Sequence, residues 1–357
     1  MSKFCIFCGC KPESKTKEHV VPRWLIELTG DPKRQVYLGL EKSGSMRKRE
    51  FSFDQFSFPA CNKCNNKYAE LEGKAKNVLI SILEKQTISP EDFNTFLDWL
   101  DKVRIGLWLG MIQLDKNYAG IEPSFHIETR MGQYDRMLIV EKSDSTRCKL
   151  NFGGTDTLSF TFGPSAFTLI VNNYYFTNIS YMFLIHRRLG FPYPASMQMS
   201  STQIQANAKF VEGSRRIMLP LLRRPISEKG AVFYQPRFGG NLTSKEHMSL
   251  YDDYAKSHCL NFEQGIGNIF EDASGELIEH KLGSSISLEP KKSQKDDTLY
   301  IQSAINIYEW QNWLITLVPS FEKLSKEHRD RIKKYLTAMK KINNILIKHH
   351  KSILKSK

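Results

Sequence analysis

The chain has 357 residues, a net charge of +13, 41% hydrophobic residues and 25% charged residues. These proportions are those of a folded soluble protein, and the length is sufficient for two domains with a large core. No run approaches 18 apolar residues and the N-terminus carries no long apolar stretch, so we expect neither a membrane span nor a secretory signal peptide.

The positive charge is concentrated at the two ends of the chain. Residues 1–80 carry 15 Lys and Arg against 9 Asp and Glu, and residues 321–357 carry 12 against 3. The 240 residues between them sum to −2. Such basic ends indicate a polyanionic partner. An ordinary solvated basic surface is the alternative.

The spacing of apolar residues, and the positions of Gly and Pro between them, predict the helices and strands in chain order. Residues 1–60 are interrupted by Gly and Pro and favour loops and short strands. Helical apolar spacing predicts a helix over residues 64–85 and a second over residues 90–114. β-branched and aromatic runs predict strands between residues 120 and 240. Residues 225–300 are polar and are expected to be mostly loop.

The C-terminal end carries a heptad pattern in which apolar residues and His alternate in steps of four and three. Lys and Arg occupy the other faces. One interpretation is a long basic helix packed on its own domain, and the other is a pairing helix that forms a homodimer. The seam residues are Leu324, His328, Ile332, Tyr335, Met339, Ile342, Leu346, His349 and Ile353.

Cysteine usage indicates a metal site and a reducing compartment. Four of the seven cysteines form two pairs, Cys5-x2-Cys8 and Cys61-x2-Cys64, separated by 52 residues. Each pair can present two thiolates to one tetrahedral Zn²⁺, and a closed four-sulfur site is structural. Four buried free thiols are the alternative. Cys10, Cys148 and Cys259 have no obvious partners, so we expect a cytoplasmic protein without a disulfide framework.

A second motif accompanies the cysteines. Glu18-His19-x2-Pro22 stands between the pairs, and Asn65 follows Cys64 directly. Together with the cysteine pairs, these residues resemble the HNH, or ββα-metal, endonuclease family, particularly zinc-stapled members such as phage Holliday-junction resolvases. The resemblance covers about residues 3–85, less than a quarter of the chain.

The resemblance implies a role for each matching residue. His19 is the expected general base that takes a proton from the attacking water, a task suited to imidazole near neutral pH. Glu18 and Asn65 are expected to hold one Mg²⁺ or Mn²⁺ through oxygen atoms at the scissile phosphate. Two features depart from the family. Its metal-binding acid is most often Asp, and its central asparagine is absent because residues 20–60 contain no Asn.

Basic side chains near the motif are candidates for contacts with the phosphate backbone. The densest run is Arg47-Lys48-Arg49, whose alternative interpretation is an exposed loop. DNA is the expected substrate, with RNA as the alternative. The candidate contacts are Arg23, Arg47, Lys48, Arg49, Lys63 and Lys67.

These observations predict an α+β protein in three parts. Residues 1–85 form a zinc-bound ββα-metal domain, residues 86–300 a mixed α+β domain for targeting or regulation, and residues 301–357 a helical segment with a long basic helix. The expected function is metal-dependent DNA hydrolysis, in a bacterial mobile element or in anti-phage defence, with a regulatory partner protein. The rival interpretations are a non-catalytic zinc module that binds nucleic acid or protein, and a pairing helix with the zinc domain as docking platform.

Overall fold

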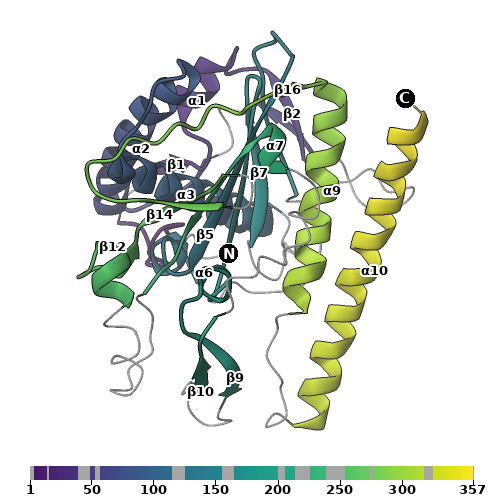
Figure 1. Cartoon of the computed structure of the whole chain (residues 1–357). Coiled ribbons are helices and arrows are strands. Elements are labelled where there is room, and N and C mark those ends of the chain that lie inside the picture. Colours follow the sequence, from purple (N-terminus) through teal and green to yellow (C-terminus); the bar gives the residue numbers. More distant parts are fainter. Residues whose placement is uncertain are drawn as a thin grey trace.

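The computed structural model of the protein shows a mixed α+β structure in which helices cover both faces of a central sheet (Figure 1). The residues that the structure describes are 4–13, 16–38, 49–52, 57–114, 125–154, 165–199, 206–213, 226–238, 254–273, 276–316 and 325–356.

The central sheet is mostly antiparallel. Its strand order is β15-β14-β11-β5-β8-β7-β6, and β16 pairs in parallel with β5. The strands are β5 (Asp135–Ser143), β6 (Leu150–Gly153), β7 (Ala166–Val171), β8 (Tyr174–Tyr181), β11 (Ala231–Gln235), β14 (Ile269–Ala273), β15 (Glu276–His280) and β16 (Ser293–Gln294). Strands β5, β7 and β8 lie in the region between residues 120 and 240 where strands were expected.

The middle of this sheet is buried on both faces. Along β5, Leu138 and Val140 join the core on one face, whereas Met137 and Ile139 join the core on the other. Because successive side chains of a strand point to opposite faces, a strand covered on both sides is apolar at every position.

One face of the sheet is covered by α3 (Pro90–Leu114) and, beyond it, by α2 (Asn62–Leu83). These helices lie where the sequence predicts them. Phe93 of α3 contacts Phe233 of β11 with ring centroids 5.1 Å apart, and Phe96 meets Phe176 of β8 edge-on at 5.3 Å. The same core continues from the sheet to Cys5, so it crosses the expected domain boundary at residue 85.

Charged groups fix α3 against the sheet. Arg136 of β5 is fully buried, forms an ion pair with Asp98 of α3 and donates a 2.9 Å hydrogen bond to Gln235 Oε1 of β11. Asp101, one helical turn from Asp98, lies 3.7 Å from the same guanidinium. Buried charges require such partners, and the network therefore restrains how α3 rotates on the sheet.

The opposite face of the sheet is covered by α9 (Asp296–Ile315), on which α10 (Lys326–Ser356) packs (Figure 1). Ile307 of α9 lies against Gly154, where an added Cβ would lie 2.6 Å from the Ile307 side chain. Asn312 of α9 donates a 2.9 Å hydrogen bond to Asn344 of α10. In the described part of the chain, no helix is long and apolar enough to cross a membrane.

The seam of α10 differs in part from the expected heptad. Met339 is buried, and Ile332, Ile342, Leu346 and Ile353 are half-buried as the seam predicts, but His328, Tyr335 and His349 are exposed. Leu336, Asn343 and His350 are covered in addition, because α9 approaches a slightly rotated face of α10. The helix thus packs on its own chain, and a homodimer through this helix stays a prediction. Leu324 lies outside the described residues.

The expectation of a mostly loop segment over residues 225–300 is wrong. The segment contains β11, a central strand whose Val232, Phe233 and Tyr234 are buried, and also β14 and the edge strand β15. Smaller elements complete the described structure: the hairpins β2–β3 (Gln35–Leu38, Arg49–Ser52), β9–β10 (Tyr193–Met199, Ala206–Val211) and β12–β13 (Cys259–Asn261, Ile266–Gly267), and the short helices α4 (Ile127–Arg130), α6 (His186–Leu189) and α7 (Ile226–Lys229).

Candidate metal centre and the adjacent strand–helix motif

The four paired cysteines form one compact cluster. The Sγ atoms of Cys5, Cys8, Cys61 and Cys64 all lie within 4.8 Å of one another, and Cys8 Sγ is 3.7 Å from Cys61 Sγ. A tetrahedral Zn²⁺ with Zn–S bonds of about 2.3 Å places its sulfurs about 3.8 Å apart. The cluster therefore has the ligand type, number and spacing of a structural zinc site.

Local backbone geometry forms the first half of the cluster. The Cys5 N–H donates to the Cys10 carbonyl at 2.8 Å, and the Gly9 N–H donates to the Cys5 carbonyl at 2.9 Å, which closes a tight turn. Gly9 has φ of +75°, and an added Cβ would lie 2.1 Å from Nε2 of His126. Only glycine fits this turn.

The second half of the cluster lies at the start of α2. Cys61 caps the helix and Cys64 lies in its first turn. The Cys61 N–H donates to Cys5 Sγ at 3.2 Å, and the Ile6 N–H donates to the Pro59 carbonyl at 2.9 Å. These cross-links bring the two cysteine pairs together in the fold.

Crowding sets the protonation of the thiols in the absence of metal. Burial raises the pKa of Cys8, but hydrogen bonds from the Cys10 backbone and from the other thiols outweigh it and leave the pKa at about 7. Burial and the neighbouring Cys8 and Cys5 raise the pKa of Cys64. The cluster thus favours one thiolate among thiols, and metal binding would release the remaining protons.

The cysteines close a strand–strand–helix unit. Strand β1 (Lys17–His19) pairs antiparallel with β4 (Ser57–Pro59), so that Glu18 lies opposite Phe58 and His19 opposite Ser57. Helix α2 begins three residues after β4, and α1 (Arg23–Leu28) follows β1. The half-buried His19 is followed by Val20, which packs against Gly106 of α3; an added Cβ there would lie 2.9 Å from Val20. Helix α3 therefore supports the end of β1.

Glu18 forms an ion pair that the sequence motif does not contain. Lys102 of α3 is fully buried, and its Nζ lies 2.5 Å from Glu18 Oε1. The same ammonium also pairs with Glu72 of α2. One lysine thereby joins β1, α2 and α3.

The triad Glu18–Lys102–Glu72 contains two carboxyl groups and one ammonium group. Burial raises the pKa of Glu72 to about 7; Lys102 opposes the shift and Glu18 adds to it. Burial lowers the pKa of Lys102, but the two carboxylates outweigh burial and raise it. The lysine is therefore charged at neutral pH, whereas Glu72 is close to half-protonated.

Asn65 lies in the first turn of α2, beside the cysteines. Its Oδ1 is buried, and no hydrogen-bond partner for it is present in the described part of the chain. An amide oxygen in this state suits a hard divalent cation such as Mg²⁺ or Mn²⁺.

The expected phosphate contacts have different surroundings. Lys63 is exposed, Arg23 forms a 2.8 Å ion pair with Glu27, and Lys67 forms a 2.7 Å pair with Glu128. Such exposed ion pairs contribute little to stability. Arg47 and Lys48 lie outside the described residues, as does the side chain of Arg49, whose backbone belongs to β3.

Sequence reasoning missed Lys102 and Glu72. Two signals could have found them. Lys102 is a cation within a predominantly apolar helix, and Glu72 lies seven residues after Asn65, on the same helical face.

Comparison with known proteins gives no match: no family profile, no curated protein and no solved structure matches this chain. The four-cysteine cluster that could hold a structural metal such as zinc is the feature of the family resemblance that the structure shows directly.

Proposed function

We propose that residues 5–83 form a zinc-stapled ββα nuclease centre that hydrolyses phosphodiester bonds of DNA. The observation that carries the proposal is the strand–strand–helix unit, which has His19 on its first strand, the buried oxygen of Asn65 on its helix and four cysteines joining the two. The chain order of these groups agrees with the sequence motif.

In this proposal each residue has one task. His19 accepts a proton from the water that attacks phosphorus. Asn65 Oδ1, with Glu18, would hold a Mg²⁺ or Mn²⁺ ion. Such an ion would neutralise the charge that develops on the leaving 3′ oxygen. Attack of water on phosphorus breaks the P–O3′ bond and yields a 5′-phosphate on one product and a 3′-hydroxyl on the other. Lys63, Lys67 and Arg23 position the backbone through its phosphates.

The Glu18–Lys102 pair adds a positioning element. The family's central asparagine, which is absent here, orients the segment bearing the base. In this chain Lys102 holds the carboxylate next to His19 and connects it to two helices. We infer that this ion pair keeps the end of β1 in place.

The test is cleavage of supercoiled plasmid by the full-length, zinc-loaded protein. We expect nicking that requires added Mg²⁺ or Mn²⁺ and leaves 5′-phosphate ends. Asn65→Ala should lose activity, and raised Mn²⁺ should restore part of it. Asn65→Asp is the matched control, because it retains an oxygen ligand. Labelled RNA duplexes in the same assay decide between DNA and RNA.

A second candidate is a non-catalytic zinc module that binds nucleic acid. The observation that favours it is the 2.5 Å contact of Lys102 with Glu18 Oε1, which neutralises an expected metal ligand with a built-in cation. Under this candidate the protein binds the plasmid, retains zinc and leaves the plasmid uncut at every Mg²⁺ and Mn²⁺ concentration.

The wider role remains a proposal by analogy. A nuclease needs restraint in its host, so a mobile-element or defence function with a regulatory partner protein is consistent with this centre. The central sheet would then serve targeting or regulation. Cleavage that appears when a purified partner is added would support this role.

A further inference from the structure

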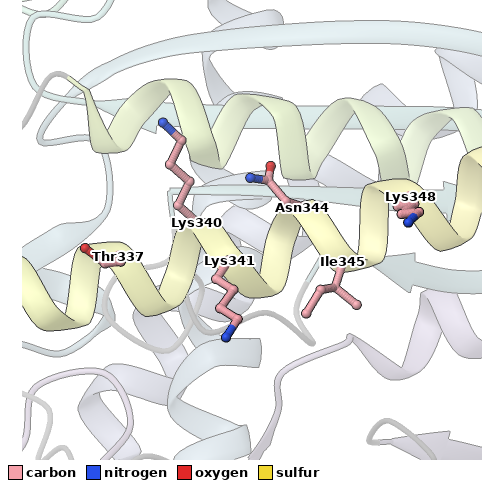
Figure 2. Close-up of a pocket in the computed structure, with 6 residues that line it drawn as sticks. All are labelled: Thr337, Lys340, Lys341, Asn344, Ile345 and Lys348. Atoms are coloured by element: carbon pink, nitrogen blue, oxygen red, sulfur yellow. The ribbon is translucent and has the colours of Figure 1, made fainter.

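Helix α10 carries exposed lysines outside the face that is buried against α9. Two of them, Lys348 and Lys355, also line a groove with Gln302 and Ile305 of α9. The inward face carries the buried Met339 and Asn343, whereas the lysines at positions 334, 341, 348 and 355 are exposed. Figure 2 shows Lys341 and Lys348 among the side chains around a hollow on this helix. Thr337, Lys340, Asn344 and Ile345 complete the lining of the hollow.

These four lysines, named here the lysine ridge, recur every seven residues. Seven residues are nearly two turns of an α-helix, so the ridge runs along one side of α10 with a drift of about 20° per repeat. Its first and last lysines are 21 positions apart, which is about 31 Å at 1.5 Å per residue. The ridge is therefore a straight row of charges on a rigid element.

The ridge lies in an acid-free segment. Residues 331–357 contain nine Lys and Arg and no Asp or Glu. Lys351, at the border of the ridge, pairs with Glu309 of α9 at 3.2 Å. Among the described residues, no ion pair involves a ridge lysine. Four parallel ammonium groups repel one another, and a bound polyanion would remove this repulsion.

We propose that the lysine ridge binds the phosphate backbone of double-stranded nucleic acid without reading its sequence. A duplex carries one negative charge per about 1.7 Å of axis, and one turn is about 34–36 Å long. The ridge has a comparable length and the opposite charge.

The side chains of the ridge favour a duplex over other polyanions. Single-strand binding relies on aromatic side chains that stack on bases. The exposed Tyr335 and His349 each directly follow a ridge lysine, so they lie about 100° around the helix from it and outside the row. A helix lying on a membrane must insert its apolar face, and the apolar seam of α10 is packed on α9. Phosphate contact through lysine alone supplies affinity without sequence discrimination.

This surface is independent of the zinc unit. Helix α10 lies on the opposite side of the central sheet from α2 and α3 (Figure 1). The inference therefore does not rest on the proposed nuclease, and a protein that never cuts DNA would still bind through the ridge.

The test measures binding of a fluorescent 20-base-pair duplex by anisotropy, across a salt series and without added divalent cation. The ridge variant carries Lys→Gln at positions 334, 341, 348 and 355, since Gln removes the charge and retains helix propensity. The matched control carries Lys→Gln at Lys76, Lys256, Lys281 and Lys292, which are exposed on other elements and lower the net charge equally. Circular dichroism checks that both variants remain folded.

We expect the ridge variant to bind about 10- to 100-fold more weakly at low salt and to reduce the slope of log K against log salt by about 3–4. The control should retain the wild-type slope. His19→Ala should bind as the wild type does, which separates this result from any failure of the nuclease proposal. Equal losses in the two quadruple variants, or an unchanged slope in the ridge variant, would overturn the proposal. So would a larger effect on binding to phosphatidylserine vesicles or to single strands than to the duplex.

Discussion

Two regions of this protein use lysine in opposite ways. Beside the zinc unit, Lys102 of α3 is fully buried between the carboxylates of Glu18 and Glu72. On α10, the lysine ridge is exposed and forms no ion pair within the described residues. The two regions lie on opposite faces of one sheet and belong to one continuous chain (Figure 1).

The comparison shows that burial decides whether a lysine serves stability or binding. A buried ion pair adds little net stability because desolvation of its charges is costly, but removal of one partner leaves an uncompensated buried charge. Lys102 therefore holds β1, α2 and α3 in fixed relative positions. An exposed lysine contributes little to stability, so the ridge is free to serve binding. Substitution of Lys102 should therefore lower the stability of the protein, whereas substitution of ridge lysines should lower its affinity for polyanions.

The largest expected effect is loss of the metal. Cys64→Ser should prevent zinc binding and unfold the N-terminal unit, because zinc binding in small modules contributes free energy on the order of 10 kcal/mol to folding. Elemental analysis should find about one zinc per chain in the wild type. The exposed Cys148→Ser is the control and should keep the metal. Reduced wild-type protein that is folded without zinc would contradict the structural role of the site.

Removing the buried lysine should have the next largest effect. Lys102→Met leaves Glu18 and Glu72 buried together without a counter-charge, and we expect a loss of about 3–5 kcal/mol in the free energy of unfolding. Urea denaturation measures it. Lys74→Met is the control, since its pair with Glu70 is exposed and should contribute less than about 1 kcal/mol. Equal losses in the two variants would remove the distinction between buried and exposed lysines.

The packing of α10 gives the third test. Met339 is buried in the seam, and Met339→Ala should cost about 2–3 kcal/mol by loss of apolar contacts. Ile345 is 58% exposed, and Ile345→Ala should cost less than about 0.5 kcal/mol. Light scattering on both variants tests the homodimer prediction, because a pairing surface on the outer face would make Ile345→Ala change the mass.

The smallest expected effect concerns pH. Glu72 has a folded pKa of about 7, above its usual value, so it binds more protons in the folded than in the unfolded chain. Its contribution to stability is complete at pH values below the unfolded pKa and is lost as pH rises through about 7. Glu72→Gln should stabilise the protein by about 1–2 kcal/mol at pH 8 and have little effect at pH 4. Thermal melts across pH 4–8 measure this difference, and an unchanged pH profile would exclude a raised pKa.

The sequence was sufficient where a residue's neighbours along the chain determine its structure. Cys-x2-Cys pairs form local turns, and the apolar spacing of α2 and α3 is a property of single helices, so the metal cluster and both helices could be predicted. Strands β5 and β7 were recognisable from their β-branched and aromatic runs.

The sequence was insufficient where distant segments meet. Strand β11 is short and lies in a polar region, and its place between β5 and β14 depends on long-range pairing. The ion pair of Lys102 with Glu18 joins residues 84 positions apart, which no local pattern indicates. In α10, Leu336 and His350 are covered where Tyr335 and His349 were expected, because the approach of α9, not the helix period, selects the buried face.

The most direct test of the proposed function is single-turnover cleavage of plasmid by an excess of His19→Ala or of the wild type, under matched Mg²⁺ or Mn²⁺. A positioned general base contributes about 10²–10⁴-fold in rate. The account predicts that His19→Ala loses this factor while zinc content, unfolding free energy and duplex affinity remain near wild type, and that added Mn²⁺ does not restore the rate. A His19→Ala variant that cuts as fast as the wild type would contradict the nuclease mechanism.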